Sequence, residues 1–162
     1  MIENNNTASR TLTHEQWQAK NQQVMKLTEH FTLEELTKSY TATQLGIDNT
    51  PSQEVVANLK ALCVHILEPL RKAYGKPIIV SSGYRCPKLN KAVKGAAQSQ
   101  HMLGQAADVH SVSDTRADNM ELWNVLKKLG LPIDQAINEY NYNWLHLSYG
   151  PRNRRRFFSL PH

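Results

Sequence analysis

Long apolar runs are missing from this sequence. No stretch approaches the roughly 20 apolar residues that a membrane-spanning helix requires. The first residues, 2–7, are polar and lack the apolar core of a secretory signal peptide. We therefore expect a chain made in the cytoplasm, or exported by something other than a signal of its own. A trimmed precursor would have the same appearance.

Cysteine is also scarce, and the chain has no internal repeat or low-complexity linker. Cys63 and Cys86 alone are too few for a disulfide framework. Cys63 falls on the apolar face of a predicted helix, which indicates a small buried side chain. The 162 residues, 40% of them hydrophobic, suit one compact domain. We expect a polar N-terminal tail at 1–30, with weak helical character at 13–30, and a single domain at 31–162.

Positive charge exceeds negative charge. The formal net charge of +5 and the pI near 9.3 predict attraction to polyanions such as nucleic acids, wall polymers and lipopolysaccharide. No nucleic-acid-binding motif accompanies this charge, so we expect no nucleic-acid partner. The densest basic run, Arg152 and 154–156, is typical of a solvated sheet edge that resists aggregation. Attraction to wall phosphates is a second interpretation of this run.

Apolar residues recur at helical spacing through the middle of the chain. Thr50 is the expected cap of a helix, because Pro51 suits the first helical position. Pro69 lies inside the pattern, where proline ends or kinks a helix, and Gly75 marks the end. The pattern predicts one long helix whose apolar face is formed by Val55, Leu59, Leu62, Ile66 and Leu70.

Shorter patterns predict the remaining elements. Thr32 and Glu35 form a capping box for a short helix that ends near Lys38. Helices are also expected at 87–93 and 115–129, the latter with Met120, Trp123 and Leu126 on its apolar face. Strands are expected at 77–81, 106–109, 134–139, 144–149 and 155–159. Helices packed on a small antiparallel sheet make this an α+β domain.

One stretch, 99–108, combines an imidazole and a carboxylate around a glycine. In a continuous helix, His101 and Asp108 would lie roughly 10 Å apart along the axis, at ~1.5 Å per residue. Zinc binds both groups at about 2.0–2.2 Å, so the two side chains must converge to share an ion. A turn at Gly104 that leads into a strand from Ala106 would bring them together, since glycine tolerates positive φ.

A third metal ligand is needed, because a catalytic zinc usually has three protein ligands and an open position for water. His146 is the best candidate, and it lies in a predicted strand. His110 is the alternative, because it follows Asp108 by two residues and would share its face of a strand. His110 could instead contact one of the metal ligands without binding the metal itself. The remaining histidines have no motif around them: His14, His30 and His162 are expected in solvent, and His65 at the rim of the core.

Glu139 is the candidate general base. Glu139 and His146 are symmetric about a turn centred between Tyr142 and Asn143. A hairpin without a bulge would make them cross-strand partners, with Cβ atoms about 4.5–5.5 Å apart. Glu139 would then reach water at the open metal position and serve as base and later as acid. An ordinary Glu–His pair on a hairpin surface is the alternative.

Arg85 is the candidate substrate-binding residue. It follows the strand predicted at 77–81, and loop residues on a rigid scaffold often bind substrate. A guanidinium can pair with a carboxylate or polarise a carbonyl. A structural salt bridge to Asp108 or Glu139 is the alternative.

Four ordered blocks of residues lie between 31 and 158. They are Ser82-Gly-Tyr-Arg85 with Pro87 and Asn90, Ser99-x-His101-x-x-Gly104-x-Ala106-x-Asp108, Asp134-Gln135-x-Ile137-x-Glu139, and Trp144-x-His146-x-Ser148. Together they resemble the zinc D-alanyl-D-alanine carboxypeptidases and related peptidoglycan endopeptidases, including phage endolysins. The hedgehog signalling domain resembles the same peptidases.

The resemblance implies a zinc cofactor held by His101, Asp108 and His146. It places Arg85 near the carbonyl or carboxylate of the substrate. Ser99 would contact substrate or support a ligand, and a simple turn residue is the alternative. Many relatives carry an acidic residue three positions before the last histidine ligand, where this chain has Asn143. Asparagine cannot act as a base, so Glu139 is the expected base.

The resemblance also implies a function at the bacterial wall. The substrates would be peptidoglycan stem peptides, cut either as a D-Ala-D-Ala carboxypeptidase or as an endopeptidase of the L-Ala–D-Glu type. Small size and basic charge fit a phage or prophage lysis enzyme, with a host remodelling enzyme as the alternative. A second hypothesis is a zinc-binding but catalytically inactive module for wall binding or structure. Nothing in the sequence indicates an oligomeric state.

Overall fold

Five strands form one sheet in the computed structural model, which describes residues 25–161. They are β1 (Ile78–Ser82), β2 (Ala106–Ser111), β3 (Gln135–Glu139), β4 (Trp144–Ser148) and β5 (Arg156–Leu160). Their order across the sheet is β1-β2-β4-β3-β5. All neighbouring strands are antiparallel except β3 and β5, which run parallel. The predicted α+β class is confirmed, and β5 is the exception to the predicted antiparallel sheet.

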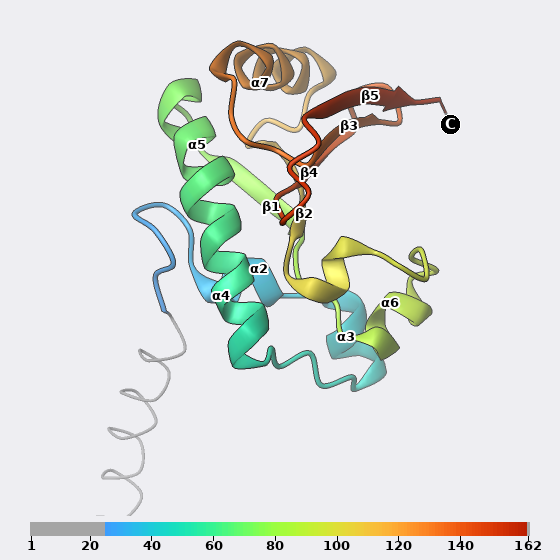
Figure 1. Ribbon diagram of the computed structural model, residues 1–162. Coiled ribbons are helices and arrows are strands. Elements are labelled where there is room, and N and C mark those ends of the chain that lie inside the picture. Colours follow the sequence, from blue (N-terminus) through green and yellow to red (C-terminus); the bar gives the residue numbers. More distant parts are fainter. Residues whose placement is uncertain (1–24, 162) are drawn as a thin grey trace, which may run out of the picture.

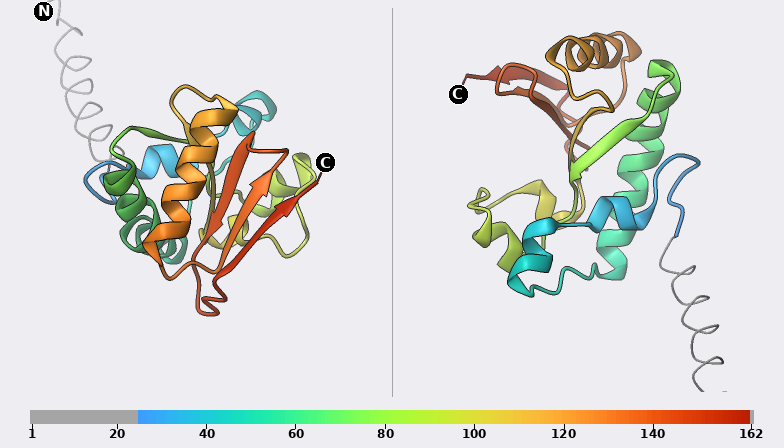
Figure 2. Two further views of the ribbon diagram at one scale, coloured as in Figure 1. Left: turned by 90° about the horizontal axis from the view of Figure 1, so that it is seen from above. Right: turned by 180° about the vertical axis from the view of Figure 1, so that it is seen from behind.

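The helical segments form two groups around this sheet (Figure 1). They are α2 (Leu33–Thr37), α3 (Tyr40–Leu45), α4 (Gln53–Leu62), the π-helical turn η1 (Cys63–Leu67), α5 (Glu68–Tyr74), α6 (Pro87–Ala92), the 3-10 turn η2 (Gln100–Leu103) and α7 (Arg116–Leu129). The continuous α4–η1–α5 rod and α7 flank the strands, whereas α3 and α6 lie side by side at the end of β1 (Figures 1 and 2).

The long helix begins two residues later than the sequence predicted. Asp48 Oδ1 accepts hydrogen bonds from the amide and the hydroxyl of Thr50, at 3.0 and 2.6 Å. Ser52 caps the helix instead, and its Oγ accepts from the Val55 amide at 3.2 Å. Pro69 lacks an amide donor and its ring disturbs the carbonyl four residues earlier, which accounts for the π-helical turn before it. The rod ends at Gly75, as predicted.

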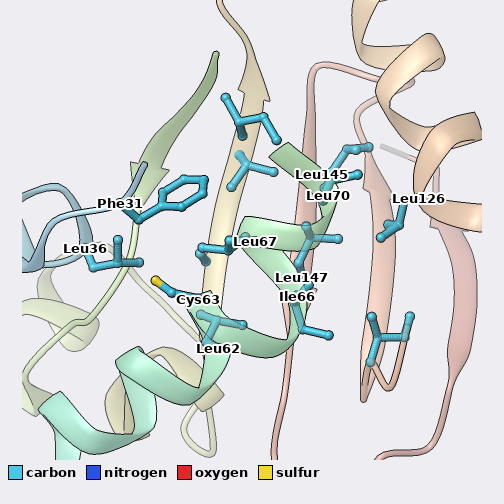
Figure 3. Close-up of a cluster of buried hydrophobic side chains, with 14 of the residues drawn as sticks. Phe31, Leu36, Leu62, Cys63, Ile66, Leu67, Leu70, Leu126, Leu145 and Leu147 are labelled. Carbon is cyan, nitrogen blue, oxygen red and sulfur yellow. The ribbon is translucent and has the colours of Figure 1, made fainter. Parts of the chain in front are cut away.

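The hydrophobic core lies between this rod, α7 and one face of the sheet. The sheet contributes Ala107, Val109, Ala136, Leu145 and Leu147. Figure 3 shows the side chains of the rod and of β4 meeting there. Cys63 is fully buried, as predicted, and burial together with the charges of Glu35 and Glu68 raises the pKa of its thiol to about 12. The core face of α7 was predicted with one error: Leu122 is buried, while Met120 is exposed.

The opposite face of the sheet carries the polar residues. Side chains alternate between the two faces of a strand, so the neighbours of the core residues point away from the core. Register pairs join Ser82 to Asp108, Asp108 to His146, and His146 to Ile137. One row of side chains therefore crosses the sheet with Asp108 and His146 at its centre.

The N-terminal part of the domain differs from the prediction. The weak helix expected at 13–30 lies mainly outside the described residues, and residues 25–30 are not helical. His30 is exposed, as expected, but it is not free: its amide and its Nδ1 each lie 2.7 Å from a carboxylate oxygen of Glu68. His14 and His162 lie outside the described residues. Among residues 25–161, no helix has the length and apolar character needed to cross a membrane.

Gly83 gives the first prediction, because a side chain there has no room. A Cβ atom at position 83 would collide with the backbone carbonyl of Leu36, which accepts from the Tyr84 amide at 2.7 Å. We expect Gly83→Ala to lower the free energy of unfolding by about 2–3 kcal/mol in urea titrations, as overpacking does. Gly75→Ala is the control, because open space surrounds Gly75. This substitution should lower the free energy of unfolding by only about 1 kcal/mol, since alanine disfavours the positive φ of 75°. Equal losses would contradict this account.

Candidate metal centre and active site

Three predicted ligands meet on the polar face of the sheet. Asp108 Oδ1 lies 3.3 Å from His101 Nε2 and 3.0 Å from His146 Nδ1. One possible ligand atom from each of these residues lies within 4.8 Å of the others. Asp108 and His146 come from paired positions of β2 and β4, and His101 comes from η2. The sequence prediction that these three side chains converge is therefore confirmed.

His101 is oriented by the chain around it. Ser99 caps η2, with its Oγ accepting from the His101 amide at 3.2 Å, and Gly104 ends η2 with a φ of 71°. The His101 ring places Nδ1 2.7 Å from the Gly83 carbonyl oxygen. A carbonyl only accepts, so Nδ1 is the donor of this hydrogen bond, and Nε2 is the nitrogen that faces Asp108. A histidine that binds metal is usually oriented in this way.

The turn at Gly104 explains how His101 and Asp108 come together although seven positions separate them. The left-handed backbone there sends the chain from η2 into β2, as the sequence predicted. A Cβ atom at position 104 would press on the Val55 carbonyl at 2.8 Å, so the turn also lies close against α4. Ser99 acts as a turn residue, which was the alternative interpretation of its sequence position. Its contact with substrate stays a prediction.

The donor set fits zinc. His101 Nε2 is buried and makes no hydrogen bond, although Asp108 Oδ1 lies 3.3 Å from it. A buried polar atom in this position is costly unless something binds it. Two ligands at about 2.0–2.2 Å in a tetrahedral site lie roughly 3.3–3.6 Å apart, close to the distances from Asp108 Oδ1. Burial alone would raise the pKa of the Asp108 carboxyl, but the two imidazoles beside it, of His101 and His146, hold it well below its usual range. Asp108 is therefore ionised, as a ligand must be.

His110, the alternative ligand, lies outside this group. Its Nδ1 is 2.7 Å from the Ser111 carbonyl oxygen and 3.2 Å from Asp114 Oδ1. Its partner in β1 is Ile79, further along the sheet from Ser82. His110 is therefore no member of the convergent set. His65 lies at the rim of the core, as predicted, and its ring stacks on Tyr149 at 4.6 Å between ring centres.

Arg85 lies beside the Asp108 carboxylate but makes only a long contact with it. Its Nη2 is 3.9 Å from Asp108 Oδ2, and its Nη1 donates to Asn90 Oδ1 at 3.2 Å. Its Nε is buried and has no hydrogen-bond partner. Burial lowers the pKa of the guanidinium, which the charge of Asp108 partly offsets. The predicted alternative, a structural salt bridge to Asp108, is present only as this long contact.

The register of the β3–β4 hairpin was predicted wrongly. Glu139 pairs with Trp144, and His146 pairs with Ile137. The turn is centred one residue earlier than predicted, which shifts the pairing by two residues. A shift of two keeps every side chain on its original face. Glu139 therefore shares the face of His146 as its diagonal neighbour, at roughly 7–8 Å instead of directly opposite.

Two buried asparagines hold the hairpin loop, and sequence reasoning missed both. Tyr140, Asn141 and Tyr142 all have positive φ, between 48° and 65°. Asn138 Oδ1 accepts from the Tyr142 amide at 2.6 Å, and Asn119 Nδ2 donates to the Tyr142 carbonyl at 2.8 Å. A polar residue on the otherwise apolar face of α7 was the available signal for Asn119, since buried polar groups need partners.

The basic run near the C-terminus is partly an internal contact, not only a solvated edge. Asp134 is fully buried, and Arg154 donates to its two oxygens from Nε at 2.7 Å and Nη2 at 3.1 Å. Arg152 Nη2 lies 3.7 Å from Asp134 Oδ2. Gln100 Nε2 donates to the same carboxylate at 2.9 Å. Asp134 therefore connects the segment directly before β5 to the turn that carries His101.

A comparison with family models agrees with this geometry. The model described as Peptidase M15 matches residues 29–148. The chain belongs to the peptidase M15 family. M15 peptidases are metallopeptidases, so a metal site at His101, Asp108 and His146 agrees with the family. A comparison with curated proteins found no match. The M15 match ends before β5 and Arg154, so the Asp134 contact joins the matched domain to the segment that follows it.

Zinc stoichiometry tests the ligand set of this M15 chain. We expect His101→Ala to lose bound zinc, because it removes one of three ligands and a buried nitrogen that lacks another partner. His110→Ala is the matched control and should keep one zinc per chain. Elemental analysis after dialysis measures both. Unchanged zinc in His101→Ala, or loss in His110→Ala, would remove this ligand assignment.

Asp134 predicts a pH dependence of stability. Hydrogen bonds from Arg154 outweigh burial and lower the pKa of Asp134 to about 2, whereas an unfolded chain has about 3.9. The resulting stabilisation, roughly 2 kcal/mol, is present above pH 4 and is lost as the pH falls towards 2.

Urea titrations at pH 7, 4 and 2 measure this dependence. Asp134→Asn should be less stable than the wild type at pH 7 and should lose less on acidification. Asp114→Asn, at an exposed position, is the control and should follow the wild type. Parallel curves for the wild type and Asp134→Asn would show that this carboxylate does not set the pH dependence.

Proposed function

We propose that this protein is a zinc-dependent peptidase that hydrolyses the stem peptides of bacterial peptidoglycan. The observation that carries the proposal is the convergence of His101, Asp108 and His146 on a single point, with His101 Nε2 buried and unpartnered. The M15 match supports the peptidase class, and the four sequence blocks support the peptidoglycan substrate. The site of action would be the bacterial wall.

Zinc at this centre would polarise the scissile carbonyl and lower the pKa of a water molecule. Arg85 would orient the substrate by donating to its carbonyl or carboxylate oxygen, for which its unpaired Nε and its long contact with Asp108 leave donors available. His101 and Asp108 would stay fixed throughout, because the Gly83 carbonyl and the β2–β4 pairing hold them.

Glu139 would transfer the proton. Its carboxylate would accept a proton from the attacking water as the new C–O bond forms, and would give it to the amine nitrogen as the C–N bond breaks. Asn143 cannot replace it in this role. The Asn143 amide donates to the Glu139 carbonyl at 3.0 Å, so this asparagine closes the hairpin that presents Glu139.

The cleaved bond separates two versions of the proposal. A D-Ala-D-Ala carboxypeptidase would release terminal alanine from a pentapeptide stem. An endopeptidase of the L-Ala–D-Glu type would cut within the stem, which suits lysis by a phage or prophage. Mass spectrometry of purified muropeptides incubated with zinc-loaded protein distinguishes these products. No cleavage at verified zinc occupancy, across several wall chemistries, would reject the peptidase and favour a zinc-binding module.

Glu139→Gln tests the proton-transfer role, because the amide keeps the shape and loses the base. We expect kcat to fall by about 10²–10⁴-fold while bound zinc is unchanged. Glu121→Gln makes the same chemical change on α7, where Glu121 pairs with Lys76 at 3.4 Å, and should keep full activity. Release of amino groups from peptidoglycan measures the rates. Equal rates for the wild type and Glu139→Gln would assign the base to another group.

A further inference from the structure

A pocket of about 320 Å³ lies beside the metal centre. Its walls come from the junction of α2 and α3 at 38–41, the end of β1 at 81–82, the segment 84–85, Leu89 of α6 and Val93 directly after α6. Figures 1 and 2 show α3 and α6 side by side beyond the end of β1. The volume is within the range of small-ligand sites, which begins at about 300 Å³.

Two residues join this pocket to the metal centre. Ser82 lines the pocket and is the register partner of Asp108. Arg85 also lines the pocket, and its Nη2 lies 3.9 Å from Asp108 Oδ2. A peptide whose scissile bond lies at the metal centre would therefore extend a neighbouring residue into the pocket.

The pocket is cationic. Lys38 and Arg85 line it, its other polar side chains are hydroxyls, and no carboxylate is among the lining residues. Within residues 25–161, Lys38 Nζ forms no ion pair with a carboxylate. Glu34 and Glu35 precede Lys38 on α2 but do not line the pocket. Three further lysines, at 88, 91 and 94, are exposed on α6 and the loop after it.

We propose that this pocket is a subsite for a free carboxylate of the stem peptide, with Lys38 as the residue that distinguishes the carboxylate from its amide. The inference rests on the proposed function. In the stem, D-glutamate continues the chain through its γ-carboxyl, so its α-carboxylate branches off as a compact anion. An ammonium and a guanidinium attract that anion, whereas the neutral carboxamide of an amidated stem lacks the charge.

Two synthetic pentapeptides test the subsite. One is L-Ala-γ-D-Glu-L-Lys-D-Ala-D-Ala, and the other carries a carboxamide in place of the D-Glu α-carboxylate. Both retain the two bonds considered above and the same C-terminal carboxylate. For the wild type we expect a lower KM for the carboxylate peptide and a similar kcat for both.

Lys38→Met should abolish this preference by raising KM for the carboxylate peptide roughly three- to tenfold. The effect is modest because solvent screens the charge of an exposed lysine. Its KM for the carboxamide peptide should be unchanged. Lys127→Met is the matched control, since it removes the same charge from an exposed position of α7. A KM that rises equally for both peptides assigns Lys38 to the C-terminal carboxylate and overturns the proposal, as does an unchanged preference.

Binding separates a failed subsite from a failed peptidase. Isothermal titration of zinc-loaded Glu139→Gln with each peptide, with and without Lys38→Met, needs no turnover. A carboxylate preference that disappears with Lys38→Met supports the subsite even if the wild type hydrolyses neither peptide. Equal affinity for the two peptides in the Lys38-containing protein, or no binding of either, would overturn the subsite whatever the hydrolytic activity.

Discussion

The hydrogen bond between His101 Nδ1 and the Gly83 carbonyl is the contact on which the proposed metal centre depends. It sets the tautomer of the imidazole and turns Nε2 towards Asp108. The carbonyl can take this position because residue 83 has no side chain, so the backbone lies against the Leu36 carbonyl. The His101 ring is thus placed by the backbone of a different segment, which joins β1 to α6.

The alternation of side chains along the strands places the core residues on one face of the sheet and the residues of the candidate site on the other. On β2 and β4, alternate side chains fill the core beneath the helices, and Asp108 and His146 lie between them on the other face. The buried core therefore fixes the spacing of the two strands, and the pairing of the strands fixes the distance between the Asp108 and His146 side chains. A rigid scaffold of this kind positions ligands more accurately than loops do.

Much of the site was predictable because its signals are local. Gly104 indicated how His101 and Asp108 could converge across seven residues, since glycine adopts the positive φ of a tight turn, and its φ is 71°. Alternation within two short strands placed Glu139 and His146 on one face. The register of their hairpin was not predictable, because the loop contains three consecutive residues with positive φ that are stabilised by Asn119 and Asn138. Neither residue lies in the loop, so the loop sequence carries no sign of them.

The sequence by itself determined the α+β class, the long apolar helix and the turn that brings His101 and Asp108 together. Each of these follows from a periodicity or a turn that neighbouring residues create. The choice of His146 over His110 as the third side chain needed the structure. Tertiary structure alone decided that Asp134 is a buried anchor for Arg154, that His30 pairs with Glu68, and that Lys38 shares a pocket with Arg85. The physical reason is sequence distance: these partners are far apart along the chain, and only packing of the elements brings their charges together.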